Sequence, residues 1–236
     1  FPEGEEPEVS LEIDRRLVQA RLLRAEAHNV EAQKVLEEAL ALCSPTRTPT
    51  LQAKVQHALG WVMWTKGDVE SSLKHLRESR AAYRVAGLPK EEVMALSALA
   101  YLQYSCGNYK IAHAQFMECL EILEQVGEQA AARLFLSKLG NLERAMGDYE
   151  SSLKHFDQGI VLQDQIGDIM TGLGNRIDRC ITLMEMGRED ESEETLNEIL
   201  AITRQRGSGA YEGLTQMTLA TLYLKQERIS EAVDAL

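Results

Sequence analysis

The sequence predicts an all-α fold, a solenoid of about six helical hairpins with a period of 40 residues. Residues 67–75 (GDVESSLKH) return almost letter for letter at 147–155 (GDYESSLKH). Glycines stand every 20 residues from Gly67 to Gly207. Self-similarity at a fixed period is the signature of stacked repeats. One column at this period is apolar throughout and predicts a core seam: Leu36, Leu76, Phe116, Phe156, Leu196 and Leu236.

The glycines set the limits of the predicted helices. Glycine takes positive φ at little cost, so helices commonly end just before one. Each interval then holds one helix of roughly 17 residues and a tight turn. Residues 1–10 are acidic and rich in Pro and Gly, which predicts a linker or tail. The repeat domain is expected over 11–236, with hairpins near 11–43, 50–87, 90–127, 129–167, 169–207 and 210–236, the last one truncated.

Two columns of small residues predict where paired helices cross at close range. Small side chains on both helices of a pair let the backbones approach while their neighbours interdigitate. Gly140→Leu is therefore expected to destabilise the fold by about 1–3 kcal/mol through overpacking. The columns are Ala20, Gly60, Ala100, Gly140, Cys180 and Ala220 on the first helices, and Ala32, Ser72, Ala112, Ser152, Ser192 and Ala232 on the second.

Composition excludes several classes of partner. The 236 residues carry a net charge of -12, which disfavours nucleic acid and anionic membranes as partners and makes a basic or neutral partner the expectation. The four cysteines show no CxxC spacing, so neither a zinc site nor a redox pair is indicated, and we expect reduced thiols in a cytoplasmic protein. Cys119 and Cys180 are expected in the core. Neither a membrane-spanning run nor a signal peptide is indicated.

The repeat unit resembles the tetratricopeptide repeat, whose pattern runs Leu-Gly, then Tyr, Ala and Phe. It departs from that pattern in having 40 residues rather than about 34. It also lacks the closing Pro, and Leu96 and Leu136 replace the early Trp. Longer repeats of this kind are similar to those of the Leu-Gly-Asn scaffold proteins and to the helical sensor arms of bacterial regulators. The matching residues are Leu139-Gly140, Gly147-Asp148-Tyr149, Ser152 and Phe156.

The resemblance implies a right-handed superhelix whose first helices line a concave groove for peptides or partner segments. It implies no catalytic residue and no cofactor. Two positions in each repeat, three residues apart, are predicted to face this groove because they share one helical face. The predicted groove residues are Arg21, Arg24, Trp61, Trp64, Tyr101, Tyr104, Asn141, Arg144, Ile181 and Met184.

Two interpretations of the aromatic residues stay open. They form an accessible binding stripe, since Trp, Tyr and Arg are enriched at binding hot spots, or they pack between repeats. Asn141 is expected to clamp a peptide backbone with its amide. For Arg21, Arg24 and Arg144 two outcomes stay open: they pair with acidic groups of a ligand, or they are solvated surface residues, which is the commoner case. His75 and His155 share one column and are expected to be lone surface residues.

The sequence therefore predicts a protein-interaction module that binds a peptide or partner segment in its groove. The alternative is the ligand-sensing or oligomerising arm of a larger signalling or transcription regulator. An enzyme is not expected, because no phosphate loop, nucleophile elbow, carboxylate pair or metal-ligand spacing is recognisable. The chain stops at Leu236 on a core column, so we expect further chain or another molecule, including a second copy, to cover that seam.

Overall fold

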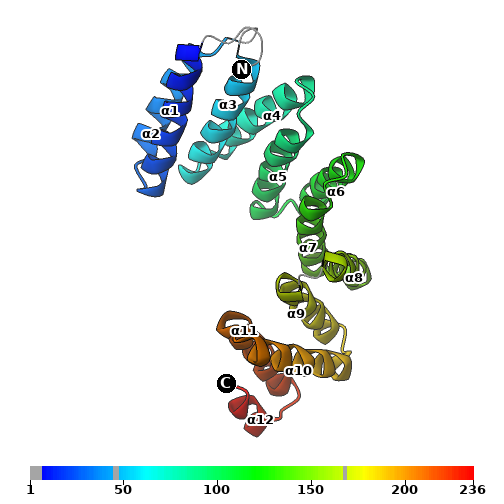
Figure 1. The fold of residues 1–236 in the computed structure, drawn as a ribbon. Coiled ribbons are helices and arrows are strands. Elements are labelled where there is room, and N and C mark those ends of the chain that lie inside the picture. The colour runs from blue at the N-terminus through cyan, green and yellow to red at the C-terminus, as the bar shows by residue number, and fades with distance from the viewer. Residues whose placement is uncertain (1–6, 45–47, 167–168) are drawn as a thin grey trace. The chain divides into compact units, whose positions relative to one another are not determined.

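The computed structural model describes residues 7–44, 48–166 and 169–236, which form twelve α-helices (Figure 1). Consecutive helices pair into hairpins along the described chain, as predicted for an all-α repeat fold. Their contacts divide the chain into two compact units, unit 1 (Phe1–Gly127) and unit 2 (Glu128–Leu236). No helix in the described segments is both long and apolar enough to cross a lipid bilayer.

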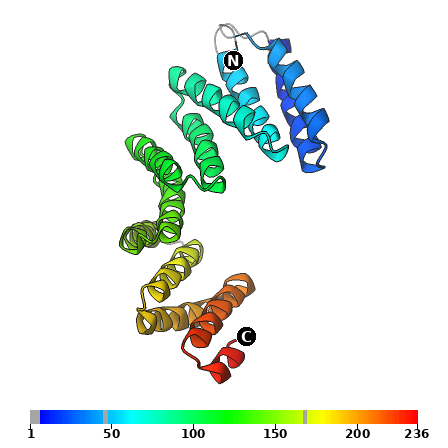
Figure 2. The same cartoon turned by 180° about the vertical axis from the view of Figure 1, so that it is seen from behind.

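Unit 1 contains three hairpins. They are α1 (Pro7–Ala25) with α2 (Asn29–Leu42), α3 (Pro49–Thr65) with α4 (Val69–Val85), and α5 (Pro89–Ser105) with α6 (Tyr109–Gln125). Helix α2 packs on α3, α4 packs on α5, and α1 also contacts α3 (Figure 2). Helix α1 begins at Pro7 and buries Ser10, so residues 7–10 belong to this helix and not to the linker expected over 1–10.

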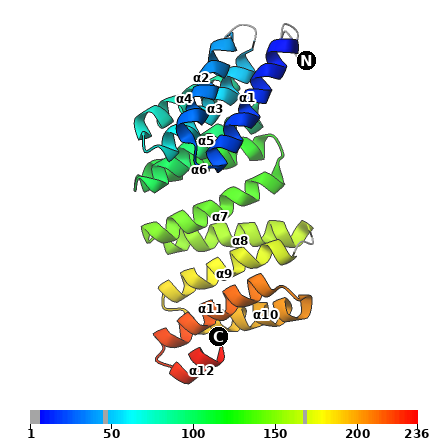
Figure 3. The same cartoon turned by 90° about the vertical axis from the view of Figure 1, so that its left-hand side faces the viewer.

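Unit 2 contains the other three hairpins among the described residues. They are α7 (Gln129–Met146) with α8 (Tyr149–Ile166), α9 (Ile169–Glu185) with α10 (Glu189–Arg206), and α11 (Gly209–Lys225) with the short α12 (Ile229–Asp234). Helix α8 packs on α9 and α10 on α11, and the first helices α9 and α11 are also in contact (Figure 3). Its main core cluster is built around Leu173, Ile177, Cys180 and Leu196.

The Gly-Asp pair at the start of the repeated motif closes one helix and opens the next. Gly67 has φ +83°, and its N–H donates to the Trp64 carbonyl at 2.9 Å while that of Asp68 donates to Met63 at 2.9 Å. This is a Schellman turn, which satisfies the last carbonyls of α3. Asp68 Oδ1 then accepts from the Ser71 N–H at 3.0 Å and caps α4. Gly147 and Asp148 form the same arrangement between α7 and α8.

The glycines that recur every 20 residues occupy turn positions with a left-handed backbone conformation. The glycines at 67, 87, 107, 127, 147, 187 and 207 all have positive φ, and Gly167 lies outside the described residues. In the turns between α1 and α2 and between α11 and α12 the equivalent residues are Ala27 (φ 63°) and Glu227 (φ 61°). The turn geometry is therefore kept where the glycine is lost.

The small columns lie at the helix crossings, as predicted. A Cβ on Gly60 would stand 2.6 Å from Leu76 Cγ. The serines of the second column also form hydrogen bonds across the crossing: the Ser72 hydroxyl donates to the Gly60 carbonyl at 2.7 Å and the Ser192 hydroxyl to Cys180 at 3.1 Å. In the apolar column Leu36, Leu76, Phe116, Phe156 and Leu196 are buried, whereas Leu236 is exposed.

Candidate functional site

A groove of about 620 Å³ lies on unit 1, lined mainly by the first helices α1 and α3. Three predicted residues, Arg21, Arg24 and Trp61, are part of its lining. They converge because positions on one helical face recur at spacings of three, four and seven residues. Five further lining residues that bear on the chemistry of the groove were not predicted: Asp14, Val18, Lys54, His57 and Met94. Their helical spacing could have identified them: Lys54 and His57, for example, lie seven and four residues before Trp61 and therefore share its helical face.

Trp61 connects this groove to the aromatic residues of α5. Its ring is half-buried and lies 5.8 Å from that of Tyr101, centroid to centroid, with an interplanar angle of 45°. Trp61 and Trp64 pack against a core cluster containing Leu76 and Leu99. Tyr101 and Tyr104, by contrast, are 46% and 41% exposed. Each of the two interpretations thus describes part of the stripe, since its indoles are packed and its phenols are accessible.

His57 is a neutral hydrogen-bond acceptor in the groove wall. Its pKa is lowered to about 4, mainly by burial; a hydrogen bond with the Met94 backbone acts against this shift, and the nearby charge of Arg24 adds to it. Trp61 Nε1 donates to His57 Nε2 at 3.4 Å, which assigns the ring proton to Nδ1. At neutral pH the imidazole therefore adds no charge and orients the Trp61 indole.

The arginines of the groove differ from most others in the chain. In the described part of the chain the side chains of Arg21, Arg24 and Lys54 form no hydrogen bond and no ion pair with another residue, and all three residues are exposed. Asp14 is the one carboxylate among the described groove-lining residues. Ion pairs elsewhere engage Arg15, Arg16, Arg80, Arg84, Arg144, Arg176, Arg179, Arg188, Arg204 and Arg228.

In unit 2 the predicted groove residues Asn141 and Arg144 bind one another and helix α9. Asn141 Nδ2 donates to Asp178 Oδ2 at 3.2 Å, and its Oδ1 accepts from Arg144 Nη2 at 2.8 Å. Arg144 also pairs with Glu185 at 3.3 Å. Burial raises the pKa of Asp178, although the Asn141 hydrogen bond and the Arg144 charge lower it. The amide expected to clamp a peptide already uses its donor and its acceptor within the protein.

Ile181 and Met184 are placed toward the core of unit 2. Met184 is 5% exposed and belongs to the cluster around Leu173 and Cys180, and Ile181 is half-buried against that cluster. The prediction that Met184 faces an open groove is wrong, because this part of α9 packs on its neighbours on both sides. The predicted residues that meet at one accessible surface are thus those of unit 1.

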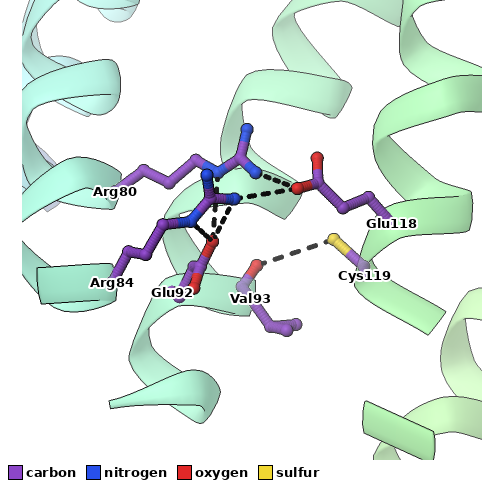
Figure 4. A network of polar contacts seen from close by, with 6 residues as sticks. All are labelled: Arg80, Arg84, Glu92, Val93, Glu118 and Cys119. Carbon is purple, nitrogen blue, oxygen red and sulfur yellow. Dashed lines mark hydrogen bonds and ion pairs between the residues drawn. The ribbon is translucent and has the colours of Figure 1, made fainter. Parts of the chain in front are cut away.

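A four-residue ion cluster ties α4, α5 and α6 together (Figure 4). Arg84 Nη2 lies 2.7 Å from Glu92 Oε1 and 2.9 Å from Glu118 Oε1, and Arg80 pairs with the same two carboxylates. Beside it the Cys119 thiol points to the Val93 carbonyl at 3.9 Å. Glu92 is buried, and its carboxylate pairs with both Arg80 and Arg84. Because a buried charge needs such partners, the cluster has a structural role.

The histidines of the second helices are partnered, which corrects their expected placement as lone surface residues. His155 Nδ1 lies 2.6 Å from Glu143 Oε2, and the two side chains are 13% and 3% exposed. His75 is hydrogen-bonded to Gln56. The sequence column gave no sign of these contacts, because the partners lie on the first helix of the hairpin. Within the described segments no three His, Cys, Asp or Glu side chains are arranged to hold a metal ion.

No protein-family model matches the chain, and no curated protein sequence matches it. Solved structures do. Nearly identical TPR-like repeats of a protein assigned as a kinesin light chain, from Podosopora anserina, are 16% identical with a TM-score of 0.71; the match covers 84% of this chain and 97% of that one. A signal transduction ATPase with a tetratricopeptide repeat sensor, from Pyrococcus horikoshii, is 12% identical with a TM-score of 0.80, covering 94% of this chain and 35% of that one.

The apo form of RapI is 11% identical with a TM-score of 0.80, and the match covers 94% of this chain and 63% of RapI. Identities this low report on backbone arrangement rather than on shared side chains. The likeness shows that the chain has a TPR-like helical repeat fold, as the repeat pattern predicted. Side chains that bind partners differ freely on such folds, so function must be argued from this chain's own groove.

Proposed function

We propose that the chain is a protein-interaction module that holds a short segment of a partner protein in the groove of unit 1. The observation that carries this proposal is the convergence of Arg21, Arg24 and Trp61 on one groove of about 620 Å³. This volume lies within the roughly 300–1,000 Å³ typical of ligand pockets. Arg, Trp and Tyr dominate binding hot spots because they combine large contact area with polar groups.

The groove chemistry supports binding rather than catalysis. General acid–base catalysis needs a group that exchanges protons near neutral pH beside a second one. The pKa of His57 is lowered to about 4, so the imidazole does not exchange protons near neutral pH, and its Nε2 already accepts a hydrogen bond from Trp61. Asp14 is the one carboxylate of the described lining. What this lining offers a ligand is exposed cations next to apolar and aromatic surface.

A second candidate role is the sensing arm of a larger regulator, favoured by the likeness to an ATPase that carries a tetratricopeptide repeat sensor. The chain spans 35% of that protein's length. In this role the same groove would bind a segment or effector on behalf of another domain. The two roles share the groove and differ in what binding changes: a scaffold localises its partner, whereas a sensor alters an activity elsewhere.

The groove can be tested with matched apolar substitutions. Val18 and Met94 line it and are 56% and 42% exposed, while Val161 on α8 and Leu214 on α11 are 55% and 42% exposed and lie on unit 2. Peptides are selected from a random displayed library on the wild-type chain, and their affinities are measured by fluorescence anisotropy. Val18→Gln with Met94→Gln is expected to weaken binding about tenfold, roughly the effect of losing 1.4 kcal/mol.

The matched control, Val161→Gln with Leu214→Gln, is expected to bind the selected peptides like the wild type. Both double variants replace residues of similar exposure with the same residue, so general effects on the surface cancel. Circular dichroism establishes that both are folded. Selected peptides that bind the groove variant and the wild type equally well would rule out the groove as the binding site.

A further inference from the structure

We infer that the groove of unit 1 selects an acidic segment with an apolar anchor, its carboxylates lying over Arg21 and Arg24 and its anchor against Trp61 and Met94. This inference rests on the proposed function and names the chemistry of the partner. Acidic side chains supply the charge and hydrogen-bond acceptors that guanidinium groups pair with. An apolar side chain fills the part of the groove between α3 and the exposed Met94 of α5.

The first support is the uncompensated positive charge of the groove. Arg21, Arg24 and Lys54 lie in the lining without an ion-pair partner in the described chain, against one carboxylate, Asp14. The chain as a whole has a net charge of -12, so the excess charge of this lining is opposite in sign to that of the chain. A concave site of one charge sign focuses the field and raises the association rate of oppositely charged ligands.

The second support is the state of His57. Because burial holds its pKa at about 4, the imidazole adds no charge at neutral pH, and the imbalance of charge in the lining comes from Arg21, Arg24 and Lys54. His57 also orients the Trp61 indole by accepting its N–H, so the half-buried ring offers the groove apolar rather than polar surface. The groove wall is thus neutral and apolar directly beside the cations.

The third support is the order of residues across the helices. Arg21, Trp61 and Tyr101 occupy equivalent positions 40 residues apart on α1, α3 and α5. The α1 position is cationic and the next two are aromatic. Helices α1 and α3 are in contact, packed helix axes lie roughly 8–10 Å apart, and an extended segment advances about 3.3 Å per residue. A segment crossing these helices would therefore place its carboxylates about three residues from its apolar anchor.

The chain carries its own reporter for a test. Its two tryptophans, Trp61 and Trp64, both belong to α3, and Trp61 lines the groove. Tryptophan emission therefore follows occupation by a peptide that contains no tryptophan. The probes are three blocked synthetic peptides: Glu-Asp-Glu-Gly-Leu-Phe-Leu, its amide form Gln-Asn-Gln-Gly-Leu-Phe-Leu, and the basic form Lys-Lys-Lys-Gly-Leu-Phe-Leu.

The acidic peptide is expected to bind at least about tenfold more tightly than the amide peptide, and this advantage is expected to shrink as NaCl is raised. The basic peptide is expected to bind most weakly. Arg21→Gln with Arg24→Gln should reduce the affinity for the acidic peptide to that for the amide peptide. The matched control is Arg77→Gln with Arg206→Gln, because these arginines are also exposed and unpaired within the described residues but lie on α4 and α10, outside the groove.

Each result decides for or against the inference. Equal affinity for the acidic and amide peptides, or equal losses in the groove and control arginine variants, overturns it. So does the absence of any emission change with the acidic peptide up to its solubility limit, or tighter binding of a single-stranded oligothymidylate. The proposed function fails separately, when library-selected peptides do not respond to the Val18 and Met94 substitutions. Selected peptides that respond to those substitutions but carry no acidic residues leave the proposed function standing and remove the acidic specificity.

Discussion

Gly140 and Phe156 touch where α7 crosses α8, so that a Cβ on Gly140 would stand 2.8 Å from Cε1 and Cζ of the Phe156 ring. Phe156 is completely buried. The first small column and the apolar column of the repeat are therefore two sides of one contact. Gly60 and Leu76 form the same contact between α3 and α4. A large residue in one column requires a small one in the other.

Gly140→Ala is expected to lower the free energy of unfolding by about 1–3 kcal/mol, because the added methyl group would stand 2.8 Å from a completely buried ring. Gly213→Ala is the matched control, since Gly213 lies inside α11 and its Cβ would meet nothing within 4 Å. That change is expected to stabilise by about 0.5–1 kcal/mol. Urea titrations followed by circular dichroism measure both. A shift of the same sign in the two variants would contradict the contact.

The pH dependence of stability should contain a contribution from His57. Its folded pKa of about 4 lies below the unfolded value near 6.5, so between these values the unfolded chain binds a proton that the folded chain does not. This contribution is fully present above pH 6.5 and is lost as the pH falls toward 4. At about 1.4 kcal/mol per pKa unit, its total is at most about 3–4 kcal/mol.

His57→Gln removes this titration, so the stability of the variant is expected to fall less steeply than that of the wild type between pH 6.5 and 4. His28→Gln is the control, because the His28 side chain is 58% exposed. Urea denaturation at a series of pH values supplies the slopes. Parallel curves for the His57 variant and the wild type would show that the buried imidazole does not titrate as described.

The His155 and Glu143 pair is expected to contribute measurably to the stability of unit 2. The two atoms lie 2.6 Å apart and both side chains are largely buried, so their interaction is little screened by water. A double-mutant cycle with alanine at each position should give a coupling of about 1.5–3 kcal/mol. The exposed pair Arg188 and Glu191 should give about 1 kcal/mol or less in the same experiment. Equal coupling energies for the two pairs would contradict the prediction that burial strengthens the interaction between His155 and Glu143.

The four cysteines are expected to react at very different rates with iodoacetamide. Cys106 is exposed, whereas Cys119 and Cys180 are buried, and burial raises the pKa of Cys180 to about 11. The thiolate is the reactive form, so Cys180 is protected both sterically and chemically. Mass spectrometry after timed labelling should find Cys106 modified first and Cys180 modified only in denaturant. Early modification of Cys180 in the native chain would contradict its placement in the core.

The repeat columns predicted the fold because each of them carries one physical constraint repeated along the chain. Glycine at the turn, a small residue at the crossing and a large apolar residue opposite it leave few alternatives at positions such as Gly67, Gly140 and Phe156. The hydrogen bonds of the crossing serines were not predicted, since smallness alone explained Ser72.

The site was predicted only in part, because groove positions carry no repeated constraint. The helical face identified Arg21, Arg24 and Trp61, but the contacts of Asn141 with Asp178 and the burial of Met184 depend on which residues face them from the next helix. Such pairings are specific to one repeat and leave no periodic signal. His57 was missed for the same reason, although it stands four residues before Trp61 on the same helical face.

The two turns without glycine, at Ala27 and Glu227, are positions where the stability of the fold can be raised without altering the groove residues. Ala27 and Glu227 hold a left-handed backbone that costs most residues about 1–2 kcal/mol and costs glycine almost nothing. Both side chains are exposed. Replacing either residue by glycine would relieve the turn while leaving the groove residues as they are. A glycine at position 27 or 227 would therefore stabilise the fold, and such a substitution could offset the destabilisation caused by a change in the groove.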